Sequence, residues 1–172
     1  MPSRKLRALP DIVAVVITRR GRSFSAGGDL EGYLRLYRHP DEFSAFLDDF
    51  FQMLNAIEAL SKIYIAAING VCVAGGLELL LACDLVIAAD SARIGDGHLN
   101  FGQLPGAGGS QRLPRAIGLL RAKHLTNLTL TTDLATGLRR EIEFVHRYAT
   151  TEPDATEGLL AFKEKRKPVF LR

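Results

Sequence analysis

The sequence predicts an α/β fold built on a mostly parallel sheet, and three features carry that prediction. Short runs of β-branched and aliphatic residues at 12–17, 63–68 and 85–89 have the pattern of strands buried on both faces, as in parallel sheets. An amphipathic helix lies between the first two runs, and an apolar stretch at 77–83 lies between the last two. Strand, helix and strand joined by short links are typical of right-handed crossover units on a parallel sheet.

The helix between the first two strands begins at Pro40. Its apolar residues recur at spacings of three and four, and Asp41 and Glu42 stand in the first turn, where negative charge favours the helix dipole. Those apolar positions are Phe43, Phe46, Leu47, Phe50, Leu54 and Ile57. The stretch at 77–83 is too apolar for a surface helix, so we expect it in the core.

The second half of the chain alternates loop and helix. Residues 102–109 are rich in glycine and predict a loop, and residues 110–120 predict a helix that the interior Pro114 should kink or break. From Leu134 the chain is helical and more charged, and a last helix at 157–165 is stopped by Pro168.

Composition places the chain among ordinary soluble domains, with 172 residues of which 47% are hydrophobic and 24% charged. The net charge of +3 is small, so neither nucleic acid nor a membrane surface is indicated as a partner, whereas an anionic small molecule fits. Cys72 and Cys83 are expected in the core, which suits a reducing compartment. Residues 1–10 lack the apolar run of a secretory signal, and no stretch reaches the roughly 18 apolar residues of a membrane span, so the default location is cytoplasmic.

Several common catalytic motifs are absent from the sequence. The glycine-rich loop is not followed by Lys-Ser or Lys-Thr, as a phosphate-binding loop would be, and no G-x-G-x-x-G follows the first strand. No G-x-S-x-G occurs. His39, His124 and His146 lack the spacing and the cysteine partners of a metal site and are expected at the surface, so no metal is predicted.

Two turns of small residues, at 25–30 and 73–76, each follow a predicted strand. Missing side chains let a ligand approach the backbone closely, and free N–H groups at a helix start concentrate positive partial charge where an enolate oxygen could lie. For either turn alone, a tight turn that needs positive φ is the more ordinary interpretation.

Five segments stand in a fixed order along the chain: FSAGGDL at 24–30, AING at 67–70 continuing to GGLEL at 75–79, ACDL at 82–85, PGAGGSQRLP at 105–114, and the ending at 157–170. In that order and spacing they resemble the crotonase (enoyl-CoA hydratase/isomerase) superfamily. Each segment alone is a weak signal, whereas five in register extend the resemblance over most of the chain from Ile12.

The resemblance implies a crotonase-like spiral of strand-strand-helix units in one domain over residues 1–172, with a spiral core at 1–125 and a helical C-terminal part at 126–172. It also implies an enzyme of fatty acid metabolism that processes an acyl-CoA and stabilises a thioester enolate in an oxyanion hole. Coenzyme A would arrive as part of the substrate, so no separate cofactor is expected. A homo-oligomer is implied as well, a trimer or a dimer of trimers.

By the same resemblance, the backbone N–H groups of Gly28 and Gly75 form the oxyanion hole. The positions that bind the substrate and its coenzyme A are Ala26, Gly27, Asp29, Leu30 and Gly76. Two fixed donors in a dry site stabilise the enolate charge, and the loss of one typically costs about 10²–10³ in rate.

Glu78 falls where hydratases of the family carry the first of two catalytic glutamates, although a Glu in a first helical turn also suits the helix dipole without any catalytic duty. The second glutamate aligns with His98, counted back from the PG of the glycine-rich loop. This is a departure from the family pattern, because an imidazole with an ordinary pKa of about 6.5 can act as acid or base but cannot be a second carboxylate. Asp96 is a neighbour that could orient the ring.

The departure at His98 leaves several activities open. Hydration is the leading one, with isomerisation or thioester hydrolysis as alternatives, since one acid/base group can move a proton and His98 could activate water. A coenzyme A-binding or assembly subunit without turnover is a further alternative. The basic segment at 163–167 is either a solvated helix end or a contact for the coenzyme A phosphates.

Members of the family are longer than this chain. By the resemblance, a strand pair and a helix should precede Ile12, and a segment with a strand and helices should follow the helix expected at 119–125, where residues 127–131 instead lead directly to the region from Thr132. Lost elements would expose core and assembly surface.

Overall fold

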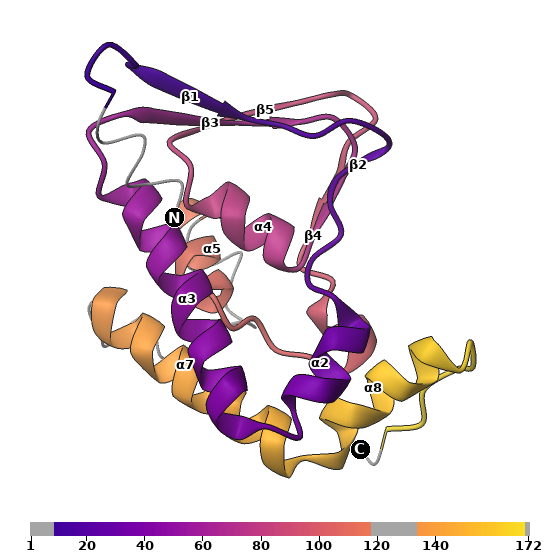
Figure 1. Cartoon of the computed structure of the whole chain (residues 1–172). Helices are drawn as coiled ribbons and strands as arrows, with labels where there is room; N and C mark the ends of the chain where they lie inside the picture. Colours follow the sequence, from indigo (N-terminus) through magenta and orange to yellow (C-terminus); the bar gives the residue numbers. More distant parts are fainter. Residues whose placement is uncertain (1–8, 118–133, 171–172) are drawn as a thin grey trace.

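The computed structural model describes residues 9–117 and 134–170, and these form two small parallel sheets with helices packed beneath and beside them (Figure 1). One sheet has the order β1-β3-β5 (Ala14–Ile17, Ile63–Ile68 and Leu85–Ala88). The other has the order β2-β4-β6 (Ser23–Ser25, Val71–Val73 and Arg93–Gly95). Every pairing between these strands is parallel, as the sequence predicts.

The chain passes from the first sheet to the second within each unit and then continues into helix. In Figure 1, β1, β3 and β5 cross the top of the molecule, while β2 and β4 descend along the right side. The helices are α2 (Leu30–Leu36), α3 (Pro40–Glu58), α4 (Gly75–Leu81), the 3-10 helix η1 (His98–Phe101), α5 (Gly109–Ile117), α7 (Leu134–Thr151) and α8 (Pro153–Lys163). This succession of two strands and a helix is the predicted spiral.

The predicted core elements are confirmed where their apolar periodicity is strongest. The helix expected from Pro40 is α3, which buries Phe43, Leu47, Leu54 and Ile57. The apolar stretch at 77–83 corresponds to α4, whose Leu77 and Leu80 pack in a cluster with Phe24, Ala66, Ile68 and Cys72. Cys72 is buried and Cys83 is half-buried, and both thiols are free. Burial raises the pKa of each thiol to about 11, so both stay protonated near neutrality.

The prediction that all three strands of the first sheet are buried on both faces is wrong for the described residues. All four residues of β5 are exposed, and Val16 of β1 and Ile87 of β5 are 59% and 64% exposed. The buried residues of β3 are Tyr64, Ala66 and Ile68, which all point to the same face. Described helices therefore cover one face of this sheet, and an apolar run by itself does not reveal whether a second layer exists.

The remaining differences are local. The α5 helix continues past Pro114 to Ile117, so the proline does not break it there. The last helix begins at Pro153, earlier than expected. His39 is exposed as expected, whereas His146 is half-buried and stacks on Phe43. The expected helix at 119–125, the junction at 127–131 and His124 lie outside the described residues.

None of the helices in the described ranges combines the length and the apolar character that crossing a membrane requires.

Candidate active site

The two small-residue turns, far apart in sequence, meet in space. A Cβ atom added to Gly27 would lie 2.8 Å from the Cβ of Ala74 and 3.5 Å from the backbone nitrogen of Gly75. Gly27 has a φ of 94°, a conformation that favours glycine, and Ala74 has a φ of 52° although it is not glycine. A non-glycine residue with positive φ is conformationally strained, and strained residues of this kind are concentrated at functional sites.

The N–H groups of Gly28 and Gly75 have no acceptor among the residues that the structure describes. Gly75 is the first residue of α4, so its N–H has no helical partner. Neither N–H donates a hydrogen bond to any described residue. Both glycines line a cavity of about 530 Å³, here called the outer cavity, together with Ala26, Asp29 and Leu30. Two unpaired backbone donors beside an open cavity have the chemistry of an oxyanion hole.

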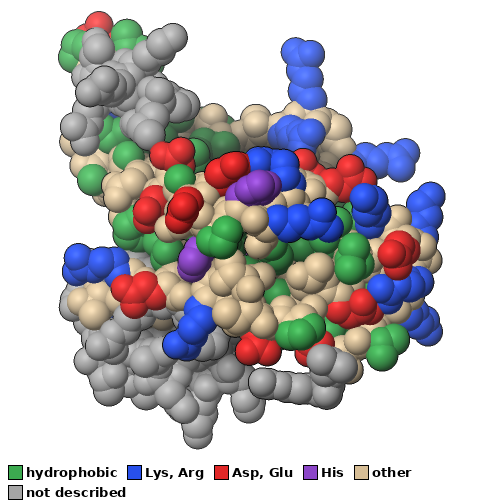
Figure 2. Space-filling view, turned by 60° about the horizontal axis from the view of Figure 1, so that its bottom comes forward, with side chains coloured by type: hydrophobic (Ala, Val, Ile, Leu, Met, Phe, Trp, Pro, Cys, Tyr) green, Lys and Arg blue, Asp and Glu red, His purple; other side chains and the backbone are tan. Residues whose placement is uncertain are grey.

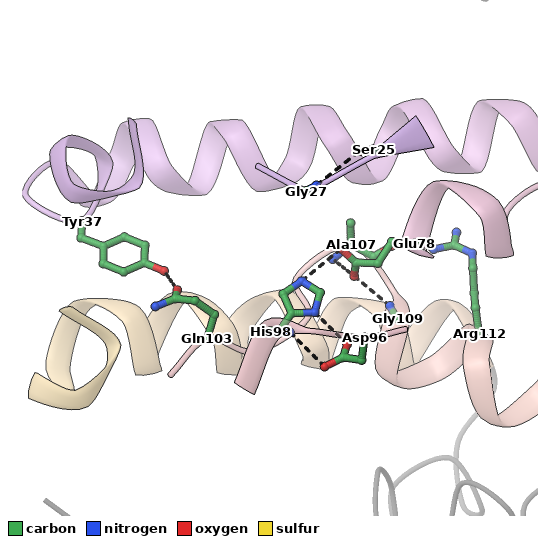
Figure 3. A network of polar contacts seen from close by, with 10 residues as sticks. All are labelled: Ser25, Gly27, Tyr37, Glu78, Asp96, His98, Gln103, Ala107, Gly109 and Arg112. Carbon is green, nitrogen blue, oxygen red and sulfur yellow. Dashed lines mark hydrogen bonds and ion pairs between the residues drawn. The ribbon is translucent and has the colours of Figure 1, made fainter. Parts of the chain in front are cut away.

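Gly27 and Gly76, also predicted to bind substrate, are not among the residues that line the outer cavity. The Gly27 N–H donates to Ser25 Oγ over 3.3 Å (Figure 3). Gly76 is buried, and a Cβ added there would lie 2.7 Å from the Ser25 Cβ and 2.8 Å from the Ser25 carbonyl oxygen. Both glycines therefore hold the two turns close together.

Glu78 lies one turn into α4 and is only 2% exposed. Its Oε1 atom accepts N–H hydrogen bonds from Ala107 and Gly109, over 2.8 and 2.9 Å, from the glycine-rich loop and the first residue of α5 (Figure 3). Its Oε2 atom lies 3.8 Å from Nε2 of His98. One carboxylate oxygen is thus held by the backbone, and the other faces the imidazole.

His98 is the first residue of η1 and is oriented by Asp96, as the sequence suggested. Its Nδ1 lies 2.7 Å from Asp96 Oδ1, and its backbone N–H donates to Asp96 Oδ2 over 3.2 Å. The carbonyl of Asp96 in turn accepts the Ala74 N–H over 2.6 Å. The segment that carries His98 is therefore tied to the turn that carries the Gly75 N–H.

These three titratable groups shift one another. Burial raises the pKa of Glu78 above its ordinary value, although the charge of His98 and the two backbone N–H groups act against this. Burial opposes the charging of His98, but the hydrogen bond to Asp96 and the charges of Glu78 and Asp96 outweigh it, so the pKa of His98 is raised. For Asp96, burial is outweighed by the hydrogen bonds and charge of His98, and its pKa is lowered. The pKa shifts of His98 and Asp96 favour a protonated imidazole paired with the Asp96 carboxylate, whereas the pKa shift of Glu78 favours its neutral acid form.

Arg112 was not singled out by the sequence, yet it anchors the loop that holds Glu78 (Figure 3). Its guanidinium binds both carboxylate oxygens of Glu58 over 2.8 Å each, and it is only 4% exposed. The same group donates to the carbonyl of Ala107 over 2.7 Å. Arg112 therefore holds the carbonyl of Ala107 in place, next to the N–H groups of Ala107 and Gly109 that bind Glu78.

A second, much smaller cavity of about 30 Å³ is lined by both Glu78 and His98, and is here called the inner cavity. Most of its wall is apolar, with Tyr33, Tyr37, Phe43, Phe46, Leu47, Phe50, Leu104 and Val145. The Tyr37 hydroxyl donates to Gln103 Oε1 (Figure 3). Gln103 Nε2 donates to the carbonyls of Phe101 and Ala155. The helical periodicity of α3 predicted several of these residues, but only as core.

The basic segment at 163–167 is exposed and stands beside the outer cavity. Lys165 and Arg166 line a neighbouring cavity that shares Asn100, Phe101 and Phe162 with the outer one. Arg166 is paired with Glu157 and Glu164, and basic and acidic side chains are mixed over the face that Figure 2 shows. The segment is therefore solvated, and its Lys165 and Arg166 line a cavity next to the outer one.

The sequence matches one family over more than half of its length. Residues 4–139 match the sequence model of the family described as Enoyl-CoA hydratase/isomerase. The chain is 42% identical over 213 positions to the Mycobacterium tuberculosis protein named "Probable enoyl-CoA hydratase echA8", covering 94% of this chain and 81% of that protein. It is 44% identical over 208 positions to the Mycosarcoma maydis "Enoyl-CoA isomerase/hydratase fer4", covering 91% and 75%.

Relatives carry additional residues inside the aligned region. The alignment with the Mycobacterium leprae echA8 protein spans 220 positions against the 172 residues of this chain, so at least 48 positions of that relative have no counterpart here. The expectation that family members are longer is confirmed.

Solved structures show the same fold. An enoyl-CoA hydratase from Bacillus anthracis superposes with a TM-score of 0.65 at 29% identity, covering 98% of this chain and 85% of that one. An enoyl-CoA hydratase from Bacillus halodurans superposes with a TM-score of 0.76 at 20% identity, covering 92% and 85%. With the five sequence segments, the fold and these matches in agreement, the chain belongs to the enoyl-CoA hydratase/isomerase family.

Proposed function

We propose that the chain hydrates a short 2-enoyl-CoA thioester, with Glu78 and His98 as its acid/base pair. The observation that carries the proposal is the approach of Glu78 Oε2 to His98 Nε2, 3.8 Å apart, beside the free N–H groups of Gly28 and Gly75. Relatives named as enoyl-CoA hydratases support the same chemistry.

The two cavities suggest how the substrate is held. The outer cavity has room for the coenzyme A arm, which would pass Ala26, Asp29 and Leu30 and carry its phosphates towards the segment at 163–167. The thioester oxygen would accept from Gly28 and Gly75. The inner cavity, at about 30 Å³, has room for a group of about one or two water molecules in size, which supports a short acyl chain.

In the reaction, the Glu78 carboxylate takes a proton from water as the water oxygen bonds to C3 of the enoyl group. The π-electron pair of the C2=C3 bond moves towards the thioester, and the two backbone N–H groups stabilise the enolate oxygen. Protonated His98 then gives a proton to C2. One molecule of water has been added, and the product is a 3-hydroxyacyl-CoA.

The close approach of the two residues also restores them for the next cycle. After addition, Glu78 carries the proton and His98 has lost one. A short movement of either side chain would close the gap between Oε2 and Nε2 to a hydrogen bond, so the proton can return directly. Asp96 stabilises the protonated imidazole before the transfer to C2 and again once the proton has returned to His98.

Thioester hydrolysis is the second candidate, and the Asp96–His98 contact favours it. A carboxylate on Nδ1 holds a histidine in the orientation in which Nε2 can deprotonate water, as in many hydrolases. In that case water attacks the thioester carbonyl, and the carbon–sulfur bond breaks.

Product analysis with crotonyl-CoA separates the candidates. Hydration removes the absorbance of the conjugated enoyl thioester and yields 3-hydroxybutyryl-CoA without free thiol, whereas hydrolysis releases the coenzyme A thiol. A 3-enoyl-CoA converted to the 2-enoyl isomer would instead identify an isomerase. Binding of acyl-CoA without any product would favour a non-catalytic subunit.

The assembly and location are proposals as well. The exposed apolar residues on β1 and β5 support a homo-oligomer, for which the family resemblance suggests a trimer or a dimer of trimers. Light scattering of the purified chain measures its molar mass. A monomer at all concentrations would contradict the proposed homo-oligomer. Cytoplasmic residence rests on the sequence alone and is tested by cell fractionation.

A further inference from the structure

Tyr33 lies where the outer and inner cavities meet. Its side chain lines the outer cavity together with Gly28 and Gly75, and it lines the inner cavity together with Glu78. His98 is shared by both cavities in the same way. A substrate whose acyl group enters the inner cavity therefore has to pass Tyr33 at the point where the thioester lies.

The hydroxyl of Tyr33 is placed directly over Gly28, whose N–H is the first proposed oxyanion donor. A Cβ atom built on Gly28 would lie only 2.2 Å from the hydroxyl oxygen and 2.6 Å from Cζ. Since a carbon–carbon bond is about 1.5 Å long, the hydroxyl oxygen lies within about 3.7 Å of the Gly28 Cα. The hydroxyl therefore lies beside the residue whose N–H is the first proposed oxyanion donor.

Aromatic neighbours hold the ring in this place. Tyr33 stacks on Tyr37 with ring centroids 6.0 Å apart, and it meets Phe43 and Phe46 edge-on at 6.4 and 5.7 Å. Tyr37 is itself fixed by its hydrogen bond to Gln103 (Figure 3). A ring confined on these sides loses little entropy when its hydroxyl binds a ligand, which is the condition for a preorganised donor.

The electrostatic surroundings keep the hydroxyl protonated. Burial, followed by the negative charges of Glu78 and Asp29, raises the pKa of Tyr33 to about 12. The hydroxyl forms no hydrogen bond with any residue in 9–117 or 134–170. The hydroxyl therefore keeps its proton and lacks an acceptor within the described ranges, and Tyr33 lines both cavities.

We propose that Tyr33 is a catalytic residue whose hydroxyl donates a third hydrogen bond to the thioester oxygen, beside the N–H groups of Gly28 and Gly75. This inference rests on the proposed function, because it assumes that an acyl-CoA thioester occupies the junction of the two cavities. The hydrogen bond from Tyr33 becomes stronger as negative charge develops on the thioester oxygen. It therefore lowers the energy of the enolate more than that of the bound substrate.

The test uses Tyr33→Phe, which removes the hydroxyl and keeps the ring in its aromatic frame. The matched control is Tyr64→Phe in β3, since Tyr64 is another buried tyrosine and lines neither cavity. The probe is butyryl-CoA labelled with ¹³C at the carbonyl, which is saturated and cannot be hydrated. Isotope-edited infrared spectroscopy reports the polarisation of its bound carbonyl, and calorimetry reports its dissociation constant.

In the parent and in Tyr64→Phe, the carbonyl band of bound butyryl-CoA should lie at lower frequency than in free butyryl-CoA. In Tyr33→Phe the band should move back towards the free value, and kcat for crotonyl-CoA should fall at least about tenfold, as expected for a hydrogen bond to a charged oxygen. The dissociation constant should change by less than about threefold. Tyr33→Leu, which also lacks the hydroxyl, should move the band in the same direction.

Three results would overturn the inference. A parent-like band in both Tyr33 variants would show that the hydroxyl does not touch the thioester oxygen. A raised KM with unchanged kcat in Tyr33→Phe would leave Tyr33 as a wall of the cavity. Failure of the parent itself to bind butyryl-CoA would remove the proposed function as well, which distinguishes the two failures.

Discussion

Glu78 and His98 face each other through one atom each, while a second polar atom of each side chain already has a hydrogen-bond partner. Glu78 Oε1 is held by the N–H groups of Ala107 and Gly109, and His98 Nδ1 is held by Asp96, which leaves Oε2 and Nε2 facing one another over 3.8 Å. This arrangement fixes the orientation of both side chains without using the two atoms that can transfer protons. An imidazole thus stands at the position where the family resemblance implies a second glutamate.

Glu78→Gln should lower kcat for crotonyl-CoA by about 10²-fold or more, the usual contribution of a general acid or base. The amide oxygen can still accept from Ala107 and Gly109, so acyl-CoA binding should be near normal. Steady-state kinetics and calorimetric binding of butyryl-CoA measure both quantities. Unchanged turnover would exclude Glu78 from the chemistry.

The same variant should be more stable than the parent at neutral pH. Because burial raises the pKa of Glu78 in the folded state, its stabilising contribution is full below the ordinary value of about 4.3 and is lost as the pH rises through the folded pKa. Replacing the ionised carboxyl by a neutral amide removes that loss. The variant should therefore unfold at a higher temperature than the parent at neutral pH, and this difference in unfolding temperature should shrink as the pH is lowered. A difference that grows towards acid pH would contradict the effect of burial on Glu78.

The activity of the parent should fall on the alkaline side as His98 loses its proton. Because the pKa of His98 is raised, the alkaline fall in the pH–activity profile should lie above the ordinary histidine pKa of about 6.5. This alkaline limb should be absent from the profile of His98→Gln. An acid limb from Glu78 should remain in that variant. The pH dependence of kcat/KM is the measurement, and an activity that rises with pH through the His98 limb would mean that neutral imidazole acts as the base.

Gly75→Pro and Gly75→Ala form a matched pair for the oxyanion hole. Proline suits the first position of a helix but lacks the N–H, so Gly75→Pro should lower kcat by about 10²–10³. Alanine keeps the N–H, and its methyl would lie 3.4 Å from Phe50, an ordinary contact, so Gly75→Ala should keep most of the activity. Equal losses in the two variants would point to backbone distortion, and unfolding temperatures measured alongside identify strain at Ala74.

The fold was largely predictable because the main helices and strands have recognisable local sequence patterns. The repeat of apolar residues along α3 and the β-branched run of β3 specify their own element types. The exposure of β5 was not predictable, since the same apolar run suits a strand with one or two covered faces. Which face is covered depends on elements elsewhere in the chain.

The candidate site was only partly predictable. Glu78 and His98 were found because motif and position coincide, and Asp96 because it lies two residues from His98. The donors that hold Glu78 are backbone N–H groups of Ala107 and Gly109, which any residue type except proline would supply. Tyr33 gave no signal either, because its hydroxyl reaches Gly28 only through the fold of α2.

Arg112→Ala should destabilise the protein by about 3 kcal/mol, because it leaves the Glu58 carboxylate and the Ala107 carbonyl without their common partner. The estimate is at the low end for a broken buried pair, since Glu58 is 34% exposed. Arg112→Lys keeps the charge but not the fork that binds both oxygens of Glu58, so its loss should be smaller. Urea unfolding measures both variants, and a stability equal to that of the parent would show that the loop needs no such anchor.

We expect Glu78 and His98 to act as one acid/base unit in hydration, and a double-mutant cycle on crotonyl-CoA tests this expectation. The four proteins are the parent, Glu78→Gln, His98→Gln and the combined variant, each assayed for 3-hydroxybutyryl-CoA. If the residues act as a unit, each single change should cost about 10²-fold or more, and the combined variant should be little worse than the poorer single variant. Losses that multiply in the combined variant, or a folded parent that binds butyryl-CoA and forms no 3-hydroxybutyryl-CoA, would contradict the expectation.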